Sequence, residues 1–142
     1  MDEPEVIKIF SGNDIILARM RVREMARLKG FDSMGQACIS LATSSLAYAL
    51  GLDRSCQGQI AIDCFRDQGC TGIRVICTKT KATGDDLSSG TFAETRRMVD
   101  ELKVEMLPSD EVRVIVIKWK DEGHRALASS LDSHHFSESA MH

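Results

Sequence analysis

The chain has 142 residues, an ordinary globular composition and a small net negative charge. Hydrophobic residues make up 43% and charged residues 27% of it, and 18 basic against 21 acidic side chains leave a formal net charge of -3. A single domain of this length can bury a core without disulfides or metals. The acidic balance argues against general nucleic-acid binding, and no apolar run reaches the roughly 18 residues of a membrane helix. We therefore expect a cytoplasmic protein whose partners include neither nucleic acid nor membrane.

The positions of histidine and cysteine argue against the commonest catalytic and metal-binding arrangements. All four histidines lie after residue 120, so residues 1–120 offer none for a catalytic triad, a Cys-His pair or a metal site. The five cysteines include no C-x-x-C pair, which leaves zinc knuckles and thioredoxin-type motifs unsupported. Residues 121–142 hold every histidine and show little periodicity, and we expect them to form a mobile tail beyond a domain spanning 1–120.

The first fifty residues predict a strand followed by two amphipathic helices. Val6–Phe10 is short and rich in β-branched residues, which is typical of a strand. Apolar residues then recur at helical spacing over Ile15–Ala26 and again over Ile39–Leu50.

Candidate capping residues set the limits of these helices. We expect Asn13 or Asp14 to cap the first helix and Gly30 to end it. Ser33 and Gln36 have the spacing of a capping box, a hydroxyl followed three residues later by an amide, at the start of the second helix.

The second half of the chain predicts two hairpins separated by a helix. Gly58–Arg66 and Gly72–Thr80 alternate well enough to form the first hairpin. Phe92–Leu102 is expected to be helical, and Val104–Leu107 with Val112–Trp119 forms the last hairpin. The order β-α-α-β-β-α-β-β predicts an α+β two-layer sandwich: a mixed, mainly antiparallel sheet of about five strands with three helices on one face.

This order, together with particular residues, resembles a known family. The residues that carry the resemblance are Asp14–Phe31, Gln36–Ala47, Gly58–Ile60, Arg97–Glu101 and Lys118–Trp119. They are similar to the small bacterial GHKL ATPases of the anti-sigma and switch-kinase type, the group of RsbT and SpoIIAB, and the match covers about residues 5–120. The resemblance implies a Bergerat-type sandwich that holds ATP between helices and a lid. It also implies partners: a STAS-domain antagonist, a sigma factor, a phosphatase or a related switch kinase.

The family's catalytic positions are altered in this sequence. Such kinases place a Glu, and four residues later an Asn, on one face of the second helix, where the carboxylate activates a hydroxyl and the amide oxygen holds Mg²⁺. The matching residues are Ser45 and Ala49. Neither side chain can do the work of the residue that it replaces.

Two further nucleotide-binding segments are degenerate. Lys79 lies at or near the position of an Asp that accepts a hydrogen bond from adenine, and Lys is a pure donor. The lid keeps one glycine, Gly90, and Glu94 would repel phosphate. We therefore expect no catalytic, cofactor-binding or metal residues, and neither ATP nor Mg²⁺ as a cofactor.

Three functions stay open. The first is a pseudokinase that regulates partners by binding alone. The second is a divergent serine kinase of the anti-sigma type that phosphorylates a STAS-domain antagonist, with Asp85, Asp86 or Glu94 as its carboxylate. The third is a sensor of a small anion, which Lys79 and Lys81 would attract.

The first helix carries the candidate partner-binding residues. Arg19, Arg23 and Arg27 recur at i, i+4 and i+8, away from the apolar face. This stripe fits either a solvated helix face or a surface that docks an acidic partner. Tyr48, beside Ala49, could fill the space of an adenine ring. The free edge of the N-terminal strand permits a homodimer.

Overall fold

The computed structural model describes residues 3–55, 58–80 and 90–120. Its elements are, in chain order, β1 (Glu5–Ile9), α1 (Gly12–Leu28), α2 (Ser33–Ala49), α3 (Leu52–Ser55), β2 (Gly58–Asp67), β3 (Cys70–Lys79), α4 (Ala93–Arg96), β4 (Glu101–Met106) and β5 (Val112–Trp119). The predicted order of elements is confirmed, with the short α3 in addition. The predictions for the tail, and those for Lys81, Asp85 and Asp86, lie outside the described residues.

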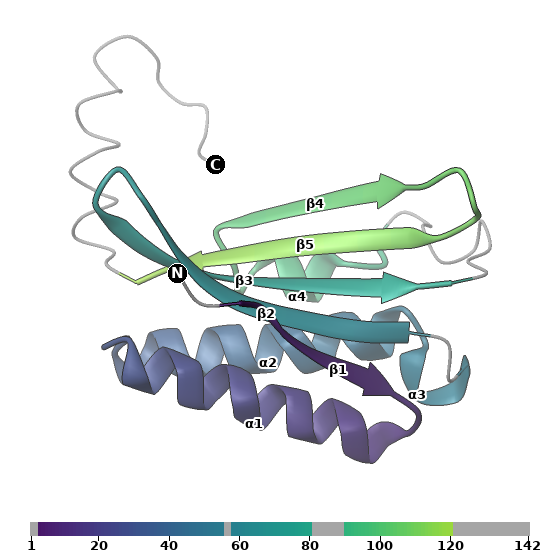
Figure 1. The fold of residues 1–142 in the computed structure, drawn as a ribbon, viewed down its shortest axis with the longest axis horizontal. Helices are drawn as coiled ribbons and strands as arrows, with labels where there is room; N and C mark the ends of the chain where they lie inside the picture. Colours follow the sequence, from purple (N-terminus) through teal and green to yellow (C-terminus); the bar gives the residue numbers. More distant parts are fainter. Residues whose placement is uncertain (1–2, 56–57, 81–89, 121–142) are drawn as a thin grey trace, which may run out of the picture.

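The strands form a single five-stranded sheet in the order β1-β2-β3-β5-β4. Each of the described pairings is antiparallel. Helices α1 and α2 lie side by side across one face of this sheet (Figure 1). The α+β two-layer sandwich is therefore confirmed. The short α3 follows the C-terminal end of α2, and the short α4 packs against the side of α2. Both add little to the helical layer.

The core lies between the sheet and the two long helices. Alternate residues of the strands point toward the helices, as the period of a strand requires, and are fully buried there. The largest of these side chains, with their helical partners, are Ile60, Ile62, Ile73, Val75, Val112, Ile15, Val22, Ile39 and Leu46. Each fully buried aliphatic side chain stabilises the fold by about 1.5–3 kcal/mol relative to an exposed one.

Helix α1 begins with a capping box built on Ser11. The Ser11 hydroxyl accepts from the Asn13 N–H at 3.3 Å, and the Asp14 carboxylate accepts from the Ser11 N–H at 3.2 Å. The prediction of Asn13 or Asp14 as the cap was therefore wrong by two or three residues. Asp14 contributes as the returning carboxylate of the box. Gly30, at φ +88°, follows the helix end as predicted.

Helix α2 is capped by Asp32, one residue before the predicted Ser33. The Asp32 carboxylate accepts from the Gly35 N–H at 2.7 Å. Gln36 does not complete a capping box, because its side-chain amide donates to the Phe31 carbonyl. An acceptor with a full negative charge is the stronger cap at the positive end of a helix.

The helix predicted over Phe92–Leu102 is wrong beyond Arg96. The Asp100 N–H donates to the Ile117 carbonyl at 2.9 Å, and the Asp100 carboxylate accepts from the Trp119 N–H at 2.7 Å. These bonds tie the segment to the end of β5, and β4 begins at the next residue. Pairing of β4 with β5 therefore stabilises this segment as a strand, although its apolar residues have helical spacing.

Gly58, the first residue of β2, is required by close packing. A Cβ there would meet the Leu52 side chain of α3 and would lie 2.8 Å from the Thr78 carbonyl oxygen. A Cβ at Gly12, the first residue of α1, would meet nothing within 4 Å. We expect Gly58→Ala to lower the free energy of unfolding by about 1–3 kcal/mol, and Gly12→Ala to be neutral or slightly stabilising. Urea denaturation of both variants tests the packing, and equal midpoints would contradict it.

Candidate functional site

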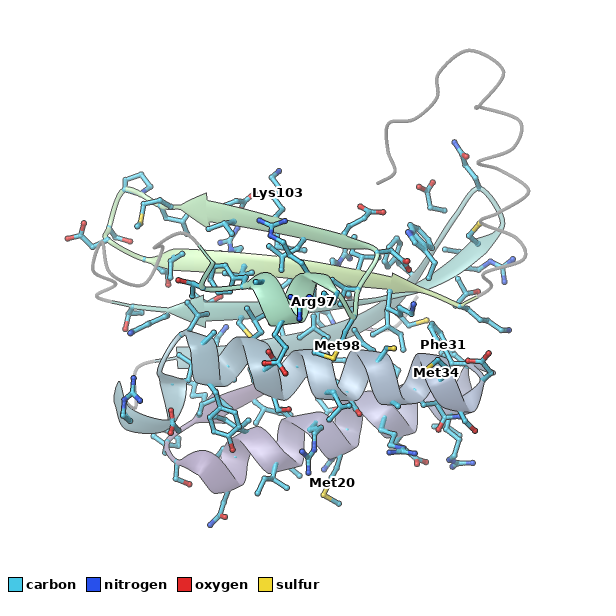
Figure 2. All side chains as sticks on the ribbon, turned by 180° about the vertical axis from the view of Figure 1, so that it is seen from behind. Met20, Phe31, Met34, Arg97, Met98 and Lys103 are labelled. Atoms are coloured by element: carbon cyan, nitrogen blue, oxygen red, sulfur yellow. The ribbon has the colours of Figure 1, made fainter. Side chains whose placement is uncertain are left out.

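The side of α2 that carries the expected nucleotide residues is covered by α4. The Ser45 Oγ of α2 and the Thr95 Oγ1 of α4 lie 2.9 Å apart and share a hydrogen bond between residues that are 50 positions apart in the chain. Thr95 is 1% exposed, and Ser45 is half-buried. In Figure 2, Met98 lies where the turn after α4 meets α2. A pair of neutral hydroxyls therefore stands where the family resemblance places a carboxylate.

Ser45 differs from the other hydroxyl residues along α2. Ser40, Thr43 and Ser44 donate to carbonyls three or four residues earlier in the same helix, at 2.7–3.2 Å. Such bonds satisfy a buried hydroxyl within its own helix. The Ser45 hydroxyl instead reaches another element, and so it joins α2 to α4.

Helix α4 is held in place by side chains on both sides of Thr95. Phe92 is buried in the main core, and Val99 packs against that core. Gly90, at φ +88°, accepts the Ala93 N–H through its carbonyl at 3.1 Å and so supports the first turn. Glu94 is exposed. The buried side of this segment therefore carries no charge.

Ala49 and Lys79 lie at the C-terminal end of α2. Ala49 packs against the core. The Lys79 Nζ lies 3.7 Å, and an Arg54 Nη atom 3.2 Å, from where a Cβ would stand at Gly51, the left-handed residue after the helix. Two cations beside the negative end of a helix are favourable. Lys79 therefore lies beside the end of α2, a location that the sequence did not indicate.

The structure thus gathers three of the four degenerate positions. Ser45 and Ala49 lie in the last two turns of α2, and Lys79, the last residue of β3, lies beside the end of that helix. Gly90 begins the segment that covers Ser45. Two residues before Lys79, Cys77 is fully buried, and burial raises the pKa of its thiol. No thiolate nucleophile is to be expected there.

The Tyr48 side chain lies on the exposed side of α2. It is 46% exposed. That it fills the space of an adenine ring stays a prediction.

One carboxylate near this end of α2 was missed by sequence reasoning. Asp53, in α3, has a buried Oδ1 with no hydrogen-bond partner among the residues that the structure describes. A buried carboxylate oxygen without a partner is costly and often marks a functional group. The sequence around it, a Leu-Asp-Arg-Ser turn, carries no motif that would have singled it out.

The three arginines of the predicted stripe on α1 do not share one environment. Arg19 and Arg23 line a hollow of about 360 Å³ between α1 and α2. Arg27 instead pairs with Glu24 at 2.6 Å. The hydrogen bond to Glu24 raises the pKa of Arg27 and lowers the pKa of Glu24. The stripe therefore divides into an internally paired arginine and two that border the hollow.

The fold and site together define a class. The molecule is a two-layer α/β sandwich with an antiparallel sheet, in which Ser45 of α2 and Thr95 of α4 share a hydrogen bond. No helix in the described part of the chain combines the length and apolar character needed to cross a membrane.

Comparison with known proteins agrees with this class. The chain is similar to the serine/threonine-protein kinase RsbT of Bacillus subtilis (strain 168), with 28% identity over 132 residues, which cover 84% of this chain and 98% of RsbT. No family model matches the chain. The similarity to RsbT supports the anti-sigma kinase family that the sequence resembles.

The contact between Ser45 and Thr95 can be measured directly. We expect Ser45→Ala and Thr95→Val each to lower the free energy of unfolding by about 1 kcal/mol, because each leaves the partner hydroxyl without its bond. The double variant should lose less than the sum of the two. Ser44→Ala is the matched control, because its hydroxyl bonds within α2, and its effect should add to that of Thr95→Val. Thermal or urea unfolding of the single and double variants measures both double-mutant cycles, Ser45 with Thr95 and Ser44 with Thr95. If the effects of Ser45→Ala and Thr95→Val simply add, the hydrogen bond contributes nothing to stability.

Proposed function

We propose that this chain is a cytoplasmic regulatory relative of RsbT that binds proteins of a bacterial partner-switching pathway and does not transfer phosphate from ATP. The observation that carries the proposal is the hydrogen bond between Ser45 and Thr95. It closes α4 onto the part of α2 where a kinase of this family would need a carboxylate. The expected partners are a STAS-domain antagonist, a sigma factor, a phosphatase or a related switch kinase.

The chemistry of the site supports binding without catalysis. A serine hydroxyl cannot serve as a general base near neutral pH. Ala49 offers no oxygen to Mg²⁺, which prefers carboxylate and carbonyl ligands. Lys79 can only donate hydrogen bonds, and it lies beside the end of α2. The three residues therefore supply neither a base, nor a ligand for Mg²⁺, nor an acceptor for adenine.

A divergent serine kinase is the second candidate, and Asp53 is the observation that favours it. Its buried, unpartnered oxygen lies in α3, directly after the helix that carries Ser45 and Ala49. Glu94 is exposed on α4 and could serve only if that segment moved. The small-anion sensor would depend on Lys79 and Arg54, the two cations beside Gly51.

Titration with nucleotide separates these candidates. We expect Mg-ATP and ADP to give no binding heat in isothermal titration up to millimolar concentration, whereas RsbT, treated identically, serves as the positive control. We also expect no phosphate transfer from γ-labelled ATP to a STAS-domain protein. The physical reason is the absence of a metal ligand and of a base at Ala49 and Ser45.

Turnover in the wild-type chain that Asp53→Asn abolishes would establish the kinase in place of the regulator. Heat from inorganic phosphate or sulfate that Lys79→Gln abolishes, without heat from ATP, would instead favour the anion sensor.

A further inference from the structure

We propose that the outer surface of the α1–α2 layer binds an amphipathic helix of a partner protein. An apolar side chain of that helix enters the hollow between α1 and α2, and its carboxylates pair with Arg19 and Arg23. This inference rests on the proposed function, because it names the surface through which a regulator without chemistry would act.

The first argument is the uneven pairing of charge along α1. Arg21 forms an ion pair with Glu5 at 2.9 Å, and Arg27 forms one with Glu24 at 2.6 Å. Within the described ranges, no carboxylate pairs with Arg19 or Arg23. These two arginines are one helical turn apart, so their guanidinium groups border the same stretch of surface. The uncompensated positive charge of α1 is therefore concentrated at the hollow.

The second argument is the apolar character of the same surface. Met20 and Leu41 line the hollow from α1 and α2 and are 60% and 48% exposed, and Ile16, one turn before Met20, is 42% exposed. Figure 2 shows Met20 projecting from α1 away from the sheet. The remaining lining residues, Ala37 and Ser40, are small, which leaves room for a side chain from outside. Exposed apolar groups gathered beside unpaired charge mark an interaction surface.

The third argument concerns the shape of the occupant. The hollow follows the groove between two neighbouring helices, and a third helix can lie along such a groove with its apolar side inward. Carboxylates at i and i+4 on that helix would match Arg19 and Arg23, which have the same spacing. An anionic membrane is a poorer match, because the hollow is lined by two cations, Arg19 and Arg23, and the chain has a net charge of -3. Glu24, the acidic residue next to Arg23 on the exposed side of α1, already pairs with Arg27.

The probe for this surface is a stapled helical peptide of about 18 residues, long enough to stay helical. It carries Glu at i and i+4 and Leu on the adjoining side, with a fluorescent label. We expect saturable binding by fluorescence anisotropy, weakened by salt because exposed charges are screened. The Arg19→Gln/Arg23→Gln variant should bind at least about tenfold more weakly. The matched Arg21→Gln/Arg27→Gln variant, with the same change of charge on the same helix, should stay within about twofold of wild type.

Met20→Gln tests the apolar part of the surface without changing any charge. It should weaken peptide binding several-fold, whereas a peptide with Gln in place of Glu should bind wild type as weakly as the original peptide binds the Arg19→Gln/Arg23→Gln variant. All the substituted residues except the half-buried Arg19 are exposed, so circular dichroism should show an unchanged fold.

Four results would overturn the proposal. They are no saturable binding at millimolar peptide, equal losses in the two arginine pairs, stronger binding to phosphatidylglycerol vesicles than to the peptide, and self-association in sedimentation that Arg19→Gln/Arg23→Gln abolishes. Failure here is distinguishable from failure of the proposed function. ATP turnover would refute the regulator but would not change the difference in peptide binding between the two double arginine variants. Equal peptide binding by those two variants would refute the docking surface but would not change the result with ATP.

Discussion

Helix α2 is the element on which the rest of the molecule depends, because each side of it meets a different neighbour. One side, with Ile39 and Leu46, is buried against the sheet. A second side of α2 packs along α1, and a third side contacts α4 through Ser45. Only its outer side, with Leu41 and Tyr48, remains exposed. A helix surrounded in this way cannot rotate or shift without disturbing every layer, since protein interiors are close-packed.

This arrangement has a consequence for chemistry. Binding a nucleotide between α2 and a lid requires polar groups that have no partner until the ligand binds. Burying such groups without a partner lowers the stability of the fold. Here the hydroxyls of Ser45 and Thr95 satisfy one another, and Lys79 lies beside the end of the helix. This pair of hydroxyls therefore needs no ligand to satisfy its hydrogen bonding.

The proposed docking surface and the contact between Ser45 and Thr95 lie close together on α2. Leu41 borders the hollow and Ser45 stands one turn later on the same helix. A partner on the outer surface would therefore contact the helix that also meets α4. The basic character of this surface is local, because two of the four arginines of α1 are neutralised within the chain.

By itself, the sequence determined whatever depends on neighbours along the chain. The period of the apolar residues defined both long helices and both hairpins, and Gly30 marked a helix end, because these signals arise within one or two turns or within one strand. The expectation that Ser45 and Ala49 stand where the family has a Glu and an Asn also came from the sequence. Only the tertiary structure decided the features that join distant segments. It ended α4 early in favour of the β4–β5 ladder and set Ser45 against Thr95. It also paired Arg21 with Glu5 and left Arg19 and Arg23 at the hollow. The physical reason is that hydrogen bonds, ion pairs and burial depend on distances in space, which local periodicity does not specify.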